Sequence, residues 1–145
     1  HNYKKELIMK PIHLLLADDD QEDCELFSEI LGELEPETQL TMVHDGVQLL
    51  QTLHNSDTGL PDVVFLDLNM PRKSGFECLE EIKENSRLKH IPIIIFSSSF
   101  DPITAEKLLQ NGARNYICKP SGYSQLKHVI SNAVEYIVKQ TTADL

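Results

Sequence analysis

The chain contains few cysteines and no long hydrophobic run. Its three cysteines, Cys24, Cys78 and Cys118, show no zinc-ligand spacing, and an odd number is a poor disulfide framework. We therefore predict that all three are buried or half-buried apolar side chains. No apolar stretch approaches the roughly 20 residues that a transmembrane helix needs. Because residues 1–10 also lack the apolar core of a signal peptide, we expect a cytoplasmic protein with no membrane partner.

Basic residues are absent from a large part of the chain. No lysine or arginine lies between Pro11 and Pro71, and the 145-residue chain carries a net charge of −10. From residue 72 onward, acidic and basic residues are nearly balanced. Nucleic-acid binding needs clustered basic side chains, and an acidic surface repels phosphates. The composition therefore predicts no nucleic-acid partner.

Two familiar catalytic motifs are also missing. The sequence has no Gly-x-Ser-x-Gly elbow for a serine nucleophile and no P-loop to hold a nucleotide. His13 and His44 fall inside apolar runs, where full or partial burial explains them better than catalysis. These observations argue against a Ser-His-Asp hydrolase and against a nucleotide hydrolase.

Short apolar runs alternate with helical patterns along the chain. Continuous apolar runs are typical of strands that are covered on both faces. The expected strands are residues 12–17, 39–44, 62–66, 93–97 and 115–118. Strands that alternate with helices imply right-handed crossovers, so we predict a doubly wound α/β fold with a five-stranded parallel sheet and helices on both faces.

Apolar residues at helical spacing predict a helix after each strand. Asp20 is the expected N-cap of the first helix. The apolar stripe of the third helix includes Phe76, and that of the fourth includes Leu109. Asn111-Gly112 is the expected stop signal of the fourth helix.

Acidic residues follow two of the predicted strands. Asp18 and Asp19 come directly after the first strand, and Asp67 comes directly after the third. Ligands of such sheets bind at the carboxyl ends of the strands, so these carboxylates should meet at one edge. Crowded carboxylates raise one another's pKa or require a cation, and their oxygens suit Mg²⁺. The sequence therefore predicts a Mg²⁺ site.

A hydroxyl and an ammonium group follow two further strands. Ser97 ends the fourth strand and Lys119 follows the fifth. Alone, a serine cluster reads as a turn, and Lys119-Pro120 reads as a strand exit. Beside an aspartate and a metal, however, they complete a phosphoryl site in which the aspartate attacks.

Taken together, these motifs resemble the receiver domains of two-component response regulators. The resemblance spans residues 11–139 and rests on Asp18-Asp19, residues 62–71 (DVVFLDLNMP), Ser74-Gly75, residues 92–97 (PIIIFS) and Lys119-Pro120, in that order. It implies a CheY-like, flavodoxin-like fold with strand order 2-1-3-4-5 and five helices. The receiver domain would cover residues 11–140, between extensions at 1–10 and 141–145. No output domain is expected after it.

The resemblance also assigns roles to individual residues. Asp67 matches the phosphorylated aspartate of the family. The metal would be bound directly by Asp19, through water by Asp18, and by the backbone carbonyl of Asn69. The remaining roles belong to the phosphate and its switch: Ser97 as the switch hydroxyl, Ser98 as the small residue that leaves the phosphate accessible, Lys119 as the phosphate-binding lysine, and Tyr116 as the aromatic residue that reports the switch.

The expected partners follow from the same resemblance. A sensor histidine kinase or a histidine phosphotransfer protein would supply the phosphoryl group. The surface around residues 102–140 would then contact an unknown downstream protein or a second copy of the chain. Residues 70–75 and 85–91 resemble the stand-alone receivers of the phytochrome-regulator type. Beyond its own phosphorylation and dephosphorylation, no enzymatic activity is expected.

A phosphatase of the haloacid-dehalogenase type is the alternative, because it shares carboxylate and Mg²⁺ chemistry. That class expects Asp-x-Asp at the nucleophile, with the second aspartate as acid and base. Here the second position is Asn69, which cannot shuttle protons at neutral pH. No cap insertion is present either, so the receiver interpretation is favoured.

Overall fold

Strands and helices alternate throughout the structure, a computed structural model that describes residues 11–34, 37–55, 57 and 59–143. The strands are β1 (Ile12–Ala17), β2 (Thr38–Val43), β3 (Val63–Leu66), β4 (Ile93–Ser97) and β5 (Asn115–Cys118). The helices are α2 (Gln21–Gly32), α3 (Gly46–His54), α4 (Gly75–Glu84), α5 (Pro102–Gln110) and α6 (Tyr123–Ala143). The expected extension at residues 1–10 lies outside the described residues, and α6 continues into the extension expected from residue 141.

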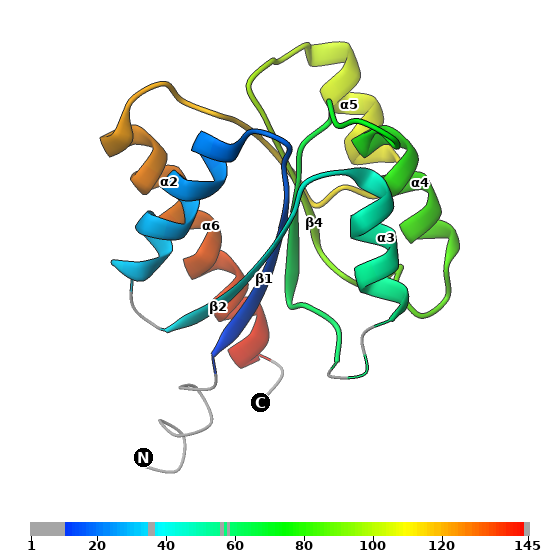
Figure 1. Ribbon diagram of the computed structural model, residues 1–145, viewed down its shortest axis with the longest axis horizontal. Helices are drawn as coiled ribbons and strands as arrows, with labels where there is room; N and C mark the ends of the chain where they lie inside the picture. The colour runs from blue at the N-terminus through cyan, green and yellow to red at the C-terminus, as the bar shows by residue number, and fades with distance from the viewer. Residues whose placement is uncertain (1–10, 35–36, 56, 58, 144–145) are drawn as a thin grey trace.

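The five strands form one parallel sheet in the order β2-β1-β3-β4-β5. Helices α2 and α6 cover one face of the sheet, and α3, α4 and α5 cover the other (Figure 1). This arrangement confirms the predicted doubly wound fold, its strand order and its two helical layers.

The central strands contribute to a hydrophobic core on each face of the sheet. Successive side chains of β1 alternate, so that Leu14 and Leu16 pack under α2 and α6 while Leu15 and Ala17 pack under the other three helices. Both faces are covered, which explains why these strands are continuous apolar runs in the sequence.

Short-range signals set the helix ends. The side chains of Asp20, Asp45 and Asp101 accept a hydrogen bond from a backbone N–H in the first turn of α2, α3 and α5. Ser74 does the same for α4 within a capping box. After α5, Gly112 adopts a φ of 110°, which favours glycine. The N-cap predicted at Asp20 and the stop predicted at Asn111-Gly112 are confirmed.

Some burial predictions are wrong. Cys24 and Cys78 are buried, but Cys118 is exposed because it ends the edge strand β5. His13 is half-buried as expected, whereas His44 is exposed because β2 already ends at Val43. Leu109 is also exposed. Consecutive helical residues point about 100° apart, so its neighbour on α5 takes the inward position.

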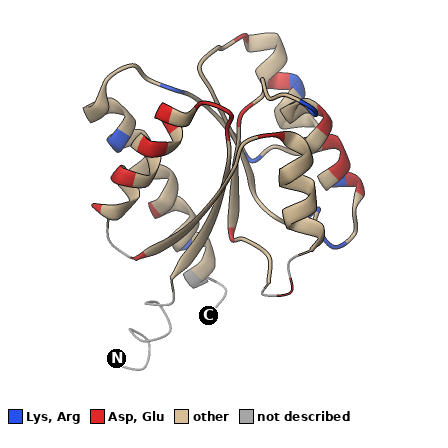
Figure 2. Cartoon of the chain, viewed as in Figure 1, with Lys and Arg blue, Asp and Glu red and all other residues tan. Residues whose placement is uncertain are grey.

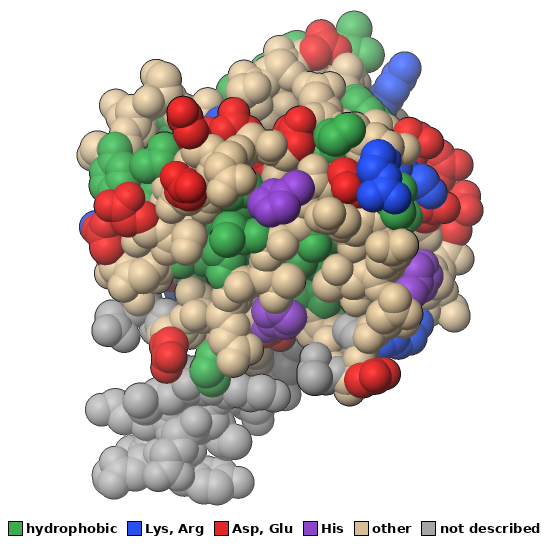
Figure 3. All heavy atoms as spheres, viewed as in Figure 1, with side chains coloured by type: hydrophobic (Ala, Val, Ile, Leu, Met, Phe, Trp, Pro, Cys, Tyr) green, Lys and Arg blue, Asp and Glu red, His purple; other side chains and the backbone are tan. Residues whose placement is uncertain are grey.

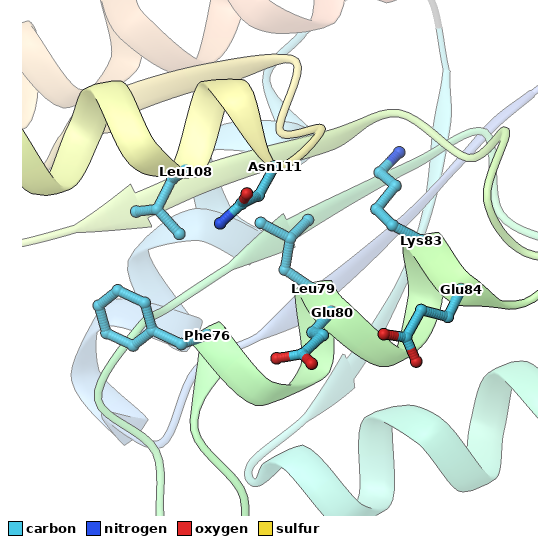
Figure 4. A pocket seen from close by; sticks show the side chains of 7 residues that line it. All are labelled: Phe76, Leu79, Glu80, Lys83, Glu84, Leu108 and Asn111. Carbon is cyan, nitrogen blue, oxygen red and sulfur yellow. The ribbon is translucent and has the colours of Figure 1, made fainter.

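Phe76 was expected in the core of α4 and is instead 44% exposed. It lies at a hollow of about 500 Å³ between α4 and α5 (Figure 4). The lining residues are Phe76, Leu79, Glu80, Lys83, Glu84, Leu108 and Asn111. None of the strand-end residues that we singled out in the sequence lines this hollow.

Across the described part of the chain, no helix combines the length and the apolar character needed to span a bilayer.

Candidate functional site

The register of the sheet brings the acidic strand ends together. Ala17 of β1 pairs with Leu66 of β3, so Asp18 and Asp67 follow at neighbouring positions. The backbone N–H of Asp67 donates to the carbonyl oxygen of Ala17 at 2.9 Å, which holds the two ends in line. The acidic segment that follows β1 lies at the upper edge of the sheet in the view of Figure 2.

Three carboxylates cluster at this edge. One oxygen from each of Asp18, Asp19 and Asp67 lies within 4.8 Å of the others. Asp18 and Asp67 are buried, while Asp19 is exposed. Because hard carboxylate oxygens at this spacing are suitable ligands for Mg²⁺, the residues present fit that ion.

Burial makes the charged state of two of these groups costly. It raises the pKa of Asp67 to about 6, and the negative charges of Asp18 and Asp19 add to this effect while Lys119 opposes it. Burial also raises the pKa of Asp18, against the hydrogen bond from Lys119. A cation bound among the three carboxylates would relieve the repulsion and favour their charged forms.

Lys119 spans the site from the end of β5. Its ammonium donates to Oδ2 of Asp18 at 2.6 Å and to Oδ2 of Asp23 at 2.9 Å. Burial lowers the pKa of Lys119, but these two hydrogen bonds outweigh it, and the net pKa lies above its usual value. Among the described residues, the ammonium forms its ion pairs with Asp18 and Asp23 and not with Asp67.

Ser97 lies fully buried at the end of β4, and its partner in β5 is Cys118. The backbone N–H of Lys119 donates to the carbonyl oxygen of Ser97 at 2.7 Å. This bond holds the backbones of the two residues side by side. Ser98 follows and is exposed, so a small side chain borders the open side of the site.

Tyr116 of β5 lies half-buried below the loop between β4 and α5. Its hydroxyl donates to the carbonyl oxygen of Ser99, and its ring meets that of Phe100 edge to face at 5.4 Å. Burial raises the pKa of the phenol, while the hydroxyl of Ser97 opposes the rise. Tyr116 thus touches the loop that directly follows Ser97, the switch hydroxyl expected from the sequence.

The loop after Asp67 requires glycine at its far end. A Cβ atom on Gly75 would lie 2.3 Å from the carbonyl oxygen of Asp67, so a larger residue would displace the backbone at the end of β3. The N–H of Gly75 donates to the carbonyl oxygen of Leu68 at 2.9 Å and closes the loop. Asn69 lies within this loop, exposed, two residues past Asp67.

The structure gathers Asp18, Asp19 and Asp67 in one cluster. It also pairs Lys119 with Asp18, and it adds Asp23 as a second partner of Lys119. Asp23 lies in the first turn of α2. Its ion pair with Lys119 joins residues 96 positions apart, and no local pattern signals such a contact.

The raised pKa of Asp67 predicts a pH-dependent stability in the absence of metal. Its pKa rises from 3.8 to about 6, so this group favours the folded state below pH 4 and loses that contribution as the pH rises through 6. Asp67→Asn removes the ionisable group, and we expect it to stabilise the metal-free protein at pH 7.5 by about 2 kcal/mol. Urea unfolding followed by circular dichroism, in EDTA, measures this difference.

The stabilisation should shrink as the pH falls toward 4 and vanish well below it, where Asp67 is protonated in both the folded and the unfolded state. An Asp67→Asn effect of the same size at both pH values would contradict an origin in the ionisation of this carboxyl. Asp20→Asn provides the control, since asparagine also caps a helix and Asp20 is exposed.

Known proteins share this fold and sequence pattern. Residues 14–131 match the family described as the response regulator receiver domain. A two-component response regulator of rice, ORR11, is 30% identical over 124 residues, which cover 86% of this chain and 82% of that protein. The response regulator Rcp1 of Synechocystis is 33% identical over 93 residues, which cover 61% of this chain and 63% of Rcp1.

Solved structures agree with this likeness. The phosphorylated cyanobacterial phytochrome response regulator RcpA has a TM-score of 0.84 at 27% identity, covering 90% of this chain and 96% of RcpA. The Mn²⁺-bound form of Rcp1 has a TM-score of 0.81 at 26% identity, covering 88% and 95% of the two chains. Structures of phytochrome response regulators are thus among those similar to this one. Because the family model matches most of its length, the chain belongs to the response regulator receiver domain family of two-component systems.

Proposed function

We propose that this chain is a phosphorylation-controlled response regulator whose acceptor is Asp67 and whose receiver unit is residues 11–140. The observation that carries the proposal is the cluster of Asp18, Asp19 and Asp67 at one sheet edge, with Lys119 beside it. Ionising a carboxyl group inside a buried acidic cluster costs folding free energy, so such a group is not there to stabilise the fold. It is well suited to a group that accepts a phosphoryl unit next to a divalent cation.

The chemistry needs a nucleophile, a cation and a donor. A carboxylate oxygen of Asp67 forms a bond to phosphorus while the bond between phosphorus and the histidine nitrogen of a kinase or phosphotransfer protein breaks. Mg²⁺, held by Asp18, Asp19, Asp67 and the carbonyl oxygen of Asn69, would neutralise charge on the phosphoryl oxygens. Ser97 and Lys119 supply a hydroxyl and an ammonium to the same oxygens, and Ser98 leaves the site open.

The partners follow from this chemistry. The donor is a sensor histidine kinase or a histidine phosphotransfer protein, both of which act in the cytoplasm. Acidic side chains gather over α2 and α4 on the face shown in Figure 3, so the surface near the site is predominantly negative. The recipient of the signal is a further protein or a second copy of this chain, contacted through α5, β5 and α6.

Phosphorylation with a small donor tests the proposal directly. We expect acetyl phosphate with Mg²⁺ to convert the chain to an aspartyl phosphate, detected by intact-mass analysis. The same incubation with EDTA in place of Mg²⁺ should leave the mass unchanged. If the mass stays unchanged with Mg²⁺ as well, or increases equally in EDTA, the proposed function is wrong.

Ser97 should couple phosphorylation to the output surface. A phosphoryl group on Asp67 can draw the Ser97 hydroxyl toward it, and Tyr116 donates to the carbonyl oxygen of Ser99 in the loop that follows Ser97. Ser97→Ala should therefore still accept a phosphoryl group but lose most of the change in oligomeric state or partner binding. Light scattering with and without beryllofluoride measures this response. Ser98→Ala is the matched control, and equal responses of both variants and the parent would refute the coupling.

A further inference from the structure

Lys119 is held by two carboxylates, of which one belongs to the cluster of Asp18, Asp19 and Asp67 and the other does not. The first is Asp18, and the second is Asp23, which lies in the first turn of α2. The side chain of Lys119 is 10% exposed, that of Asp18 is 1% exposed and that of Asp23 is 36% exposed. Asp23 is thus an outer partner of the ammonium, at the mouth of the site.

The hydrogen-bonding capacity of the ammonium is nearly used up in this arrangement. An ammonium group has three N–H donors and no acceptor. Two of them go to Asp18 and Asp23, at 2.6 and 2.9 Å. The Phe96 ring, with its centroid 5.4 Å from Nζ, covers part of the remaining space. One N–H remains, and a phosphoryl oxygen on Asp67 that draws the ammonium toward itself competes with the two carboxylates that hold it.

The geometry points to Asp23 as a positioning residue that restrains Lys119 and competes with the phosphoryl group for its ammonium. This inference rests on the proposed function of Asp67. Asp18 remains as an anchor when Asp23 is changed, and the buried lysine stem keeps the ammonium in the site. Removing the charge of Asp23 should therefore release the ammonium toward the phosphoryl oxygens without detaching it.

Beryllofluoride serves as the probe, since it mimics a phosphoryl group on an aspartate. At saturating Mg²⁺, Asp23→Asn should bind beryllofluoride about three- to tenfold more tightly than the parent, as expected for one partly exposed charged partner. Fluorine NMR of the bound probe measures the affinity. Asp23→Glu keeps a carboxylate at this position and should return the affinity toward that of the parent.

A general electrostatic effect needs a separate control. Removing any negative charge near an anion site raises its affinity for anions. Glu22→Gln removes the same charge from the same turn, and Glu22 is exposed and makes no ion pair within the part of the chain that the structure describes. An Asp23→Asn effect no larger than that of Glu22→Gln would overturn the inference.

A double-mutant cycle decides whether Asp23 acts through Lys119. In a Lys119→Met background, Asp23→Asn should have no more effect than Glu22→Gln, because no ammonium remains to be released. An undiminished effect in that background would overturn the inference. If Lys119→Met does not fold, the Asp23→Glu variant decides, and a failure of glutamate to restore the parent affinity counts against a role for the carboxylate. A parent chain that does not bind beryllofluoride at all would instead refute the proposed function.

Discussion

Asp67→Asn should abolish phosphorylation by acetyl phosphate. Asparagine keeps the shape of aspartate and its place after β3, but its amide is not a nucleophile toward phosphorus. The backbone of Asp67 is also held in place, because its N–H donates to Ala17 of β1 and Gly75 packs against its carbonyl oxygen. We therefore expect no gain in mass, measured by intact-mass spectrometry under conditions that fully phosphorylate the parent.

A neighbouring variant and a folding control make this result specific. Asp20→Asn keeps the helix cap and should be phosphorylated like the parent. Circular dichroism should show that Asp67→Asn is folded, and the metal-free variant should be the more stable protein. Complete phosphorylation of Asp67→Asn would move the acceptor to another residue and would remove the basis of the proposed function.

Asp19→Ala should show the largest loss of Mg²⁺ affinity among single changes at the site. Asp19 is exposed toward solvent, where an ion enters, and it makes no ion pair among the described residues. Loss of an indirect partner of a metal commonly costs 10- to 100-fold in affinity, so loss of a direct ligand should cost about 100-fold or more. Isothermal titration calorimetry is the suitable measurement, because the chain has no tryptophan to report binding by fluorescence.

Asp18→Ala should weaken Mg²⁺ binding less than Asp19→Ala does. The charge of Asp18 is already balanced by Lys119 at 2.6 Å, so Asp18 attracts a further cation less strongly. The order of the two effects is the critical outcome. Unchanged affinity in Asp19→Ala, or a larger loss in Asp18→Ala, would contradict the assignment of Asp19 as the direct ligand.

Local patterns in the sequence were sufficient for most of the fold. The five strands agree with the predicted runs to within one residue at each end, because each central strand is apolar on both faces and is bounded by polar residues. The cap at Asp20 and the stop at Asn111-Gly112 depend on bonds within one helical turn, so they too are readable from neighbouring residues. The strand ends then place Asp18, Asp19 and Asp67 at one edge, which follows from parallel topology alone.

Burial at the periphery could not be predicted in this way. Cys118 and Phe76 are apolar members of regular elements, yet both are exposed. Cys118 has a neighbouring strand on one side only, because β5 is an edge strand, and Phe76 borders the hollow between α4 and α5. Whether an apolar side chain is covered depends on what packs against its element, and the element's own periodicity carries no information about that.

The sequence by itself determined the order of strands and helices, the helix caps and the residues gathered at the carboxyl edge of the sheet, because these depend on local periodicity and on the direction of parallel strands. Only the tertiary structure decided how those groups share their charges. Lys119 lies 101 positions from Asp18 and 96 from Asp23, and its ammonium joins both. Such contacts arise because the fold places the first turn of α2 beside the residue that follows β5. Burial of this edge then raises the pKa of Asp67 to about 6, a property of the folded environment and not of the residue type.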